Sequence, residues 1–206
     1  MPVSFAAILL AAGGSSRLGQ PKQLLQIDGE SLVQRTARAL LSLNPARVVV
    51  VTGGSSERVS DELKGLPVHI QHNPDWPAGM GSSIALGASQ VPAEVDGVLI
   101  LLCDQWCIDT ADLNHIVSRW ASDISRIHAA SWNDENAIFY GPPAIFPRKY
   151  IHELELLKGE HGARSVINRY KHEARFIVLE NAAFDVDVPS DLKPFTAAKK
   201  RQRPPL

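Results

Sequence analysis

The sequence has few cysteines, no long apolar run and almost no net charge. Its 206 residues include only Cys103 and Cys107, too few for the disulfide framework of a small secreted domain. No apolar run approaches the roughly 18 to 20 residues of a membrane span, and the N-terminal residues lack the basic start of a signal peptide. The formal net charge of -1 excludes the basic excess typical of nucleic-acid binders. We therefore expect a cytoplasmic protein with no membrane or nucleic-acid partner.

The order of apolar segments predicts an α/β fold. The runs at 47–51 and 98–102 are apolar without alternation, as expected where helices cover both faces of a parallel sheet. Strands are expected at 5–11, 47–53, 67–71, 97–104, 126–131 and 174–180, and helices at 30–43, 55–65, 109–120 and 161–171. This alternation predicts a three-layer, doubly wound, mostly parallel sheet. We expect a single domain over 1–195 and a basic, proline-rich, disordered tail over 196–206.

The first expected strand leads into an unusual glycine-rich segment, "LAAGGSSRLGQPK", at residues 10–22. Gly13 and Gly14 allow positive φ and the close approach of a ligand to backbone N–H groups. The segment lacks the G-x-G-x-x-G of a dinucleotide fold, and Gln20 and Pro21 stand where a Walker A loop has Lys-Ser/Thr. The residues alone leave two interpretations open, an ordinary turn and a phosphate-binding loop of another kind.

This segment resembles the L-A-A-G-x-S-x-R-x-G-x-x-K signature of nucleotidyltransferases with a MobA-like fold. Within that superfamily the chain is similar to the molybdenum cofactor cytidylyltransferase group, over residues 7–192. The resemblance implies a Rossmann-like nucleotide-diphospho-sugar transferase fold, whose first loop wraps a triphosphate and offsets its charge with two cations. The Ala-Ala pair resembles the type that selects cytidine. The loop residues implied to bind the nucleotide are Leu10, Ala11, Ala12, Gly13, Gly14, Ser15, Arg17 and Lys22.

A second segment, residues 73–87, resembles the family's N-x-x-W-x-x-G-x-x-x-S region, which borders the base and ribose. The resemblance implies nucleotide contacts from Gly79, Ser82 and Ser83. Without it, a glycine-serine stretch of this kind is a plain entry into a helix.

Two aspartates are candidates for a metal site. Asp104 ends the apolar segment 97–104, at the edge of the sheet where this fold class binds ligands; its alternative role is a helix cap or a turn. The segment resembles the family's L-x-G-D-Q-P, with Cys103 and Trp106 in place of glycine and proline. Residues 184–192 resemble the closing D-[IV]-D-T-P-E-D-L motif. The resemblance implies that Asp104 and Asp187 bind Mg²⁺, an ion that usually takes one or two carboxylates plus substrate phosphates.

Together these resemblances imply a Mg²⁺-dependent nucleotidyltransferase. It would join the nucleoside monophosphate of an NTP, here CTP, to a phosphorylated small-molecule acceptor, the molybdopterin cofactor, and release pyrophosphate. Arg17, Lys22 and Asp104 would be catalytic. Residues 140–148 and 157–167 would shape the acceptor side, and a molybdoenzyme would be the protein partner.

Two alternatives stay open. The chain is also compatible with a cytidylyltransferase of another small phosphorylated metabolite. It is compatible, too, with a nucleotide-binding accessory protein of a molybdoenzyme that has lost catalysis. Cys103 and Trp106, which depart from the family pattern beside Asp104, favour this alternative. Steady release of pyrophosphate separates the enzymes from the accessory protein.

Overall fold

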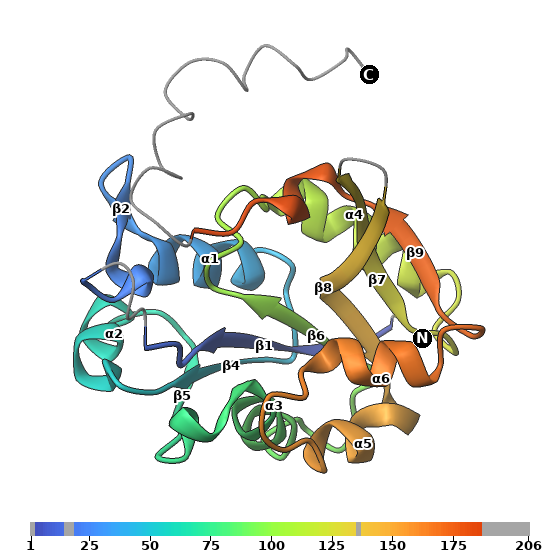
Figure 1. Ribbon diagram of the computed structural model, residues 1–206, viewed down its shortest axis with the longest axis horizontal. Helices are drawn as coiled ribbons and strands as arrows, with labels where there is room; N and C mark the ends of the chain where they lie inside the picture. The colour runs from blue at the N-terminus through green and yellow to red at the C-terminus, as the bar shows by residue number, and fades with distance from the viewer. Residues whose placement is uncertain (1–2, 15–18, 135–136, 187–206) are drawn as a thin grey trace.

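The computed structural model describes residues 3–14, 19–134 and 137–186. This part of the chain forms a seven-stranded sheet of order β5-β4-β1-β6-β8-β7-β9 (Figure 1). The strands are β1 (Phe5–Ala11), β4 (Arg47–Thr52), β5 (His69–His72), β6 (Gly97–Leu102), β7 (His128–Asp134), β8 (Ala137–Pro147) and β9 (Arg175–Val178). A separate small hairpin pairs β2 (Gln26–Ile27) with β3 (Glu30–Ser31). Strands β5, β4, β1 and β6 run parallel, and only β8 is antiparallel to its neighbours.

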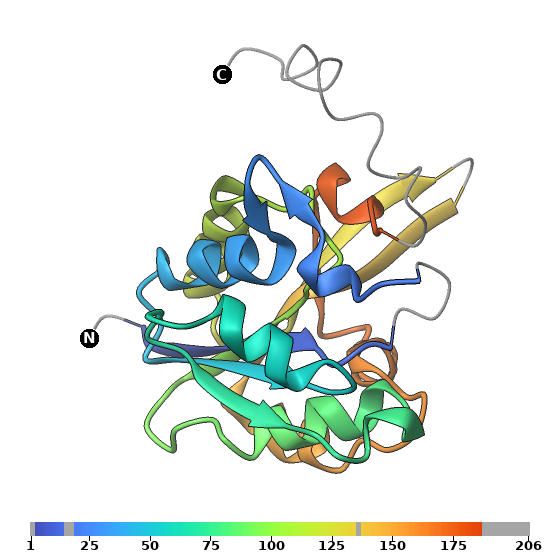
Figure 2. The same ribbon diagram turned by 90° about the vertical axis from the view of Figure 1, so that its left-hand side faces the viewer.

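Helices cover both faces of this sheet. The helix α1 (Leu32–Leu41) lies above it in Figure 2, with α2 (Ser56–Glu62) and α4 (Thr110–Ala121) on the same face. The other face carries α3 (Met80–Ala88), α5 (Ile151–Glu155) and α6 (Ala163–Arg169). Short 3-10 turns are η1 (Lys22–Leu24), η2 (Trp76–Ala78), η3 (Arg148–Tyr150) and η4 (Glu180–Ala183). The predicted three-layer, mostly parallel α/β fold is confirmed.

The central strands are apolar throughout because alternate residues enter two different cores. In β1, Leu9 packs into the core beneath α1, α2 and α4, whereas Ile8 packs into the core beneath α3, α5 and α6. In β6, Leu101 and Ile100 divide in the same way. Burial on both faces removes the polar alternation of a half-exposed strand, which explains the continuous apolar runs in the sequence.

The helix expected over 30–43 is present as α1, which begins at Leu32 with Ser31 as its N-cap. The Ser31 hydroxyl accepts a hydrogen bond from the Gln34 backbone N–H at 3.4 Å. This satisfies one of the N–H groups that the first turn of a helix leaves without an internal partner.

The long strand β8 is absent from the sequence-based prediction, which assigned residues 140–148 to the acceptor side without a secondary structure. Prolines at 142–143 argue against a central strand because they cannot donate to the ladder. The structure places them where the ladder with β7 is interrupted, since its register shifts between Ala129 and Ala130. The prolines therefore lie between two paired stretches of one strand.

The ends of the chain bear on two further expectations. Residues 187–206, which include the predicted tail and Asp187, lie outside the described residues. Within the described ranges, no helix has the length and apolar character that crossing a bilayer requires.

Candidate functional site

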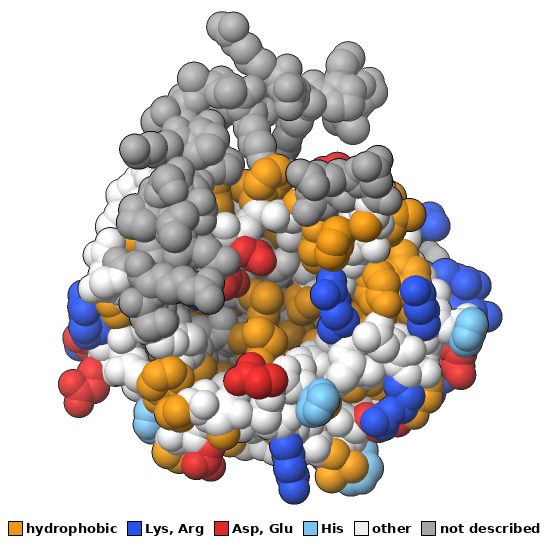
Figure 3. Space-filling view, viewed as in Figure 1, with side chains coloured by type: hydrophobic (Ala, Val, Ile, Leu, Met, Phe, Trp, Pro, Cys, Tyr) orange, Lys and Arg blue, Asp and Glu red, His pale blue; other side chains and the backbone are white. Residues whose placement is uncertain are grey.

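A cavity of about 360 Å³ opens at the carboxyl ends of the parallel strands β1 and β6. Figure 3 shows a hollow with a hydrophobic floor in the middle of this face. Adjacent parallel strands end at the same edge of a sheet, so the segments that follow them meet here. The sequence-predicted residues that line it are Leu10, Ala12, Gly13, Gly14, Lys22, Gly79, Ser83 and Asp104. The cavity therefore gathers three segments that are up to about ninety positions apart in the chain.

Lys22 and Asp104 form an ion pair between Nζ and Oδ2 inside this cavity. The lysine comes from η1 and the aspartate follows β6, and their side chains are only 19% and 17% exposed. Coulomb attraction between such partly buried charges is stronger than between surface charges. The first glycine-rich segment and the predicted metal residue thus belong to one site.

Gln23 supports the loop from beneath. Its side chain is 2% exposed, and its Nε2 donates to the carbonyl oxygens of Ala11 at 3.1 Å and Gly13 at 2.8 Å. Its Oε1 is buried without a hydrogen-bond partner in the described part of the chain. Gln23 was not among the predicted site residues, because no pattern of neighbouring residues indicates which backbone groups an amide side chain will reach.

Trp76 forms a wall of the cavity, and three glycines pack against its indole. A Cβ added to Gly14 would lie 2.8 Å from ring carbons of Trp76, and one added to Gly53 or Gly54 would lie 2.7 or 2.8 Å from them. Contacts below 3.0 Å require something to shift. The absence of side chains at these three positions therefore lets the first loop and the end of β4 close on the tryptophan.

Asn73 fixes the serines at the start of α3. Its side chain is buried, and its Nδ2 donates to the hydroxyl oxygens of Ser82 and Ser83, both at 2.9 Å. The Ser82 hydroxyl in turn donates to the carbonyl oxygens of Asp75 and Gly79 at 3.0 Å. Ser83 lines the cavity, whereas Ser82 does not and instead stabilises the turn before α3. Ala11, whose carbonyl accepts from Gln23, is also not among the residues that line the cavity.

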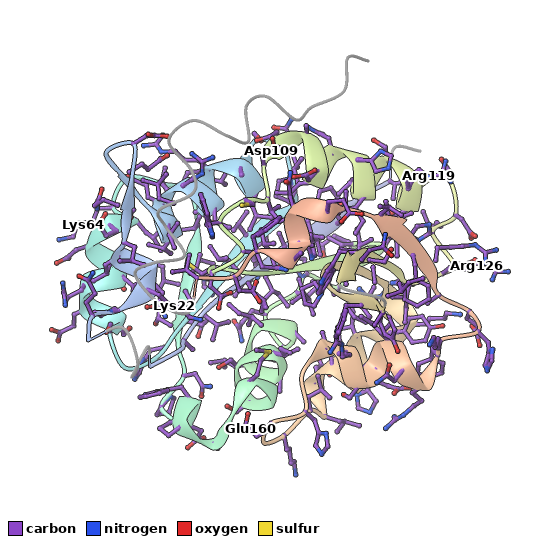
Figure 4. All side chains as sticks on the ribbon, turned by 45° about the horizontal axis from the view of Figure 1, so that its top comes forward. Lys22, Lys64, Asp109, Arg119, Arg126 and Glu160 are labelled. Atoms are coloured by element: carbon purple, nitrogen blue, oxygen red, sulfur yellow. The ribbon has the colours of Figure 1, made fainter. Side chains whose placement is uncertain are left out.

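The loop at 158–162 closes the cavity opposite Lys22. The Gly81 N–H donates to the Gly159 carbonyl at 2.8 Å. A Cβ on Gly79, which has φ of +119°, would lie 2.4 Å from the Gly159 carbonyl group, and one on Gly81 would lie 2.7 Å from the loop backbone. This tight contact holds Glu160 at the cavity wall, across from Lys22 (Figure 4). Glu160 belongs to the segment 157–167, which we expected on the acceptor side, although it was not singled out there as a site residue.

Cys103 and Trp106, the two departures from the family pattern, have different surroundings. Cys103 is buried at the cavity wall, where burial, followed by the negative charge of Asp104, raises the pKa of its thiol well above the usual range. The thiol is therefore protonated and unreactive near neutral pH. Trp106 is buried in the core beneath α1 and α4, not in the cavity wall. Its ring therefore packs beneath the helices and does not contribute to the lining of this cavity.

Three predicted site residues, Ser15, Arg17 and Asp187, lie outside the described residues. Within the described ranges, no group of three or more His, Cys, Asp or Glu side chains could hold a metal ion. Of the two aspartates predicted to bind Mg²⁺, the structure describes Asp104.

Comparison with known proteins shows what the chain is similar to. Residues 7–174 match the MobA-like NTP transferase domain. A nicotine blue oxidoreductase from Paenarthrobacter nicotinovorans is 31% identical over 140 residues, 67% of this chain and 68% of the relative. A bifunctional IPC transferase and DIPP synthase from Rubrobacter xylanophilus is 39% identical over 92 residues, 42% of this chain. The chain spans only 21% of that bifunctional relative.

Solved structures share the fold over almost the whole chain. The Rv0371c homologue from Mycobacterium sp. strain JC1 superposes with a TM-score of 0.77 at 26% identity, covering 91% of this chain and 92% of the other. Rv0371c from Mycobacterium tuberculosis H37Rv, solved in complex with manganese, has a TM-score of 0.72 at 21% identity and covers 94% and 95%.

Proposed function

This chain belongs to the MobA-like NTP transferase domain family, and from that premise we propose that it is a CTP-dependent nucleotidyltransferase acting on the molybdopterin cofactor. The observation that carries the proposal is the meeting of Gly13, Gly14, Lys22 and Asp104 around one cavity. One relative is named as an oxidoreductase. Family membership therefore does not by itself decide the reaction, and we assign the reaction from the residues of the site.

The proposed reaction needs charge neutralisation and alignment more than proton transfer. The acceptor phosphate attacks the α-phosphorus of CTP, a new P–O bond forms, and the α–β bridging bond breaks as pyrophosphate leaves with its electron pair. A phosphate monoester is mostly dianionic near pH 7, because its second pKa is about 6, so no general base is required. Among the described residues that line the cavity, Lys22 supplies the positive charge. We assign it, with Arg17, to the phosphate charges.

The ligand chemistry of the site fits a hard divalent cation. Asp104 offers carboxylate oxygens at the strand end, and Mg²⁺ needs only one or two carboxylates when phosphate oxygens complete its shell. We propose that Asp104 and Asp187 hold Mg²⁺, which would supply positive charge beside the phosphates. In the described structure Lys22 neutralises Asp104. Lys22 must therefore turn from this carboxylate toward the phosphates when nucleotide and metal enter.

Base and acceptor are assigned by similarity of motifs. The Ala11-Ala12 pair supports cytidine, and Ala12 borders the cavity. Gly79 and Ser83 form the wall next to Trp76, which we assign to the base and ribose. The segments 140–148 and 157–167 support an acceptor site of the molybdopterin type, and a molybdoenzyme as the protein that receives the product.

The test begins with thermal shifts in CTP, GTP, UTP and ATP, each with and without Mg²⁺ or Mn²⁺. A ligand at 100 times its Kd stabilises the native state by about 2.7 kcal/mol. We expect the largest shift with CTP and divalent metal, and then steady pyrophosphate release when molybdopterin is added. No shift with any triphosphate would refute the phosphate site. Binding without turnover would identify an accessory protein.

A further inference from the structure

The hydrogen bonds of Gln23 determine how the backbone of the first loop is turned. The buried Nε2 donates to two carbonyl oxygens in alternate peptide groups, those of Ala11 and Gly13. Both peptide bonds are trans, since the only cis bond recorded in the described residues is Pro142–Pro143. In a trans peptide, C=O and N–H point in opposite directions. The N–H groups of Ala12 and Gly14 therefore point away from Gln23.

These two N–H groups are available to a ligand. Neither Ala12 nor Gly14 donates a backbone hydrogen bond to any acceptor in the described ranges. Both residues line the cavity, next to Lys22. Ala12 is buried, where an N–H group is nearly always paired, whereas Gly14 is exposed at the cavity mouth. Two such N–H groups beside a cation make an anion-binding concavity.

We propose that Gln23 is a positioning residue that turns the N–H groups of Ala12 and Gly14 toward the phosphates of the nucleotide. This rests on the proposed function, because it takes the cavity to be a triphosphate site. The ligand class is a polyphosphate, and Gln23 acts on it only through the backbone. Fixing the donors before the ligand arrives removes the reorganisation that binding would otherwise require.

The buried Oε1 supports a positioning role over ordinary packing. An amide that only filled space would be expected to satisfy both of its polar atoms, because a buried acceptor without a partner is destabilising. Gln23 instead directs both donors of its Nε2 to the loop and leaves Oε1 without a partner in the described structure. The two loop hydrogen bonds thus take precedence at this position.

The experiment measures binding of inorganic tripolyphosphate and of CTP by calorimetry, without metal, to the full chain. The variants are Gln23→Met, which fills similar space without donors, and Gln23→Glu, which presents a carboxylate to the same two carbonyls. Thr36→Val is the matched control, because Thr36 is a buried residue whose hydroxyl donates to a carbonyl, that of Leu32 at 2.8 Å, within α1. We expect tripolyphosphate to bind at least tenfold more weakly to both Gln23 variants and equally well to the control.

A pH series separates positioning from stability. A protonated carboxyl group donates one hydrogen bond, so Gln23→Glu should recover affinity, relative to the wild type, as the pH falls. Gln23→Met should show no such recovery. A loss of affinity in Gln23→Glu that does not depend on pH would overturn the proposal.

Spectra of the unaltered chain supply a test that needs no variant. In ¹H–¹⁵N correlation spectra, tripolyphosphate should move the amide protons of Ala12 and Gly14 downfield as they form charge-assisted hydrogen bonds. If the wild type binds neither CTP nor tripolyphosphate, the proposed function itself fails. If it binds them while these two amides stay unmoved, or while Gln23→Met binds equally well, the role of Gln23 is refuted and the phosphate site stands.

Discussion

Removing the Lys22 cation tests the site most directly. A hydrogen bond to a charged group contributes about 1.5–3 kcal/mol, which corresponds to a roughly 10- to 150-fold change in rate. Lys22→Ala also leaves the Asp104 carboxylate, only 17% exposed, without the described partner of its ion pair, so that it repels the incoming phosphates. We therefore expect kcat for pyrophosphate release, with CTP, Mg²⁺ and acceptor, to fall at least tenfold. Metal-free CTP binding should weaken as well.

Two further variants sharpen this prediction. Asp104→Asn leaves Lys22 positive beside a neutral amide, so metal-free CTP should bind more tightly than to the wild type, while the gain from adding Mg²⁺ should disappear. Lys64→Ala is the matched control, because Lys64 lies on the outside of the molecule (Figure 4) with its side chain 78% exposed and paired with Asp61. A near-wild-type rate for Lys22→Ala would remove its catalytic role. So would an equal loss in Lys64→Ala.

Three other changes have defined outcomes. Gly14→Ala places a methyl group 2.8 Å from the Trp76 ring; overpacking of this kind costs about 1–3 kcal/mol, so we expect a lower melting temperature even without nucleotide, measured by calorimetry. Gly81→Ala, with 2.7 Å to the loop at 158–162, should lower the melting temperature and CTP affinity together, and a loss of neither would show that the loop yields freely. Burial lowers the pKa of His128 from 6.5, so the unfolded chain binds a proton that the folded chain does not. The free energy of unfolding, followed in urea at a series of pH values, should fall as the pH drops below about 6.5 through that lowered pKa, and His128→Gln should remove this part of the slope.

The parts of the fold that follow from local chemistry could be predicted from the sequence. Strands β1, β4 and β6 are apolar on both faces, and α1 begins at a serine whose hydroxyl accepts from the helix. Asp104 is the second residue after the end of β6, at the edge where an α/β sheet binds ligands. Strand β8 could not be found in this way. Its prolines are admitted by a register shift that depends on the neighbouring strand.

Only the site residues that stand in recognisable motifs could be predicted from the sequence. Gly13, Gly14, Lys22 and Asp104 stand in recognisable segments, and the fold brings them to one cavity. Glu160 reaches the same cavity because the loop at 158–162 packs against Gly79, which precedes α3, and against Gly81, which lies in α3. The segment 157–167 was expected on the acceptor side from its motif, but which of its residues reaches the cavity depends on this packing between distant parts of the chain.

Gly13 and Gly14 in the first loop lack a side chain for different reasons. The sequence suggested backbone freedom for both, yet neither appears among the glycines with positive φ in the described residues. Gly14 has no room for a methyl group against Trp76, whereas a Cβ on Gly13 would meet nothing closer than 3.8 Å. If Gly13 lacks a side chain so that a phosphate can lie against it, Gly13→Ala should not change the melting temperature of the ligand-free chain. The same variant should bind CTP and tripolyphosphate at least tenfold more weakly. If the variant binds both as the wild type does, the phosphates do not lie against Gly13, and the cavity holds them deeper, beside Lys22.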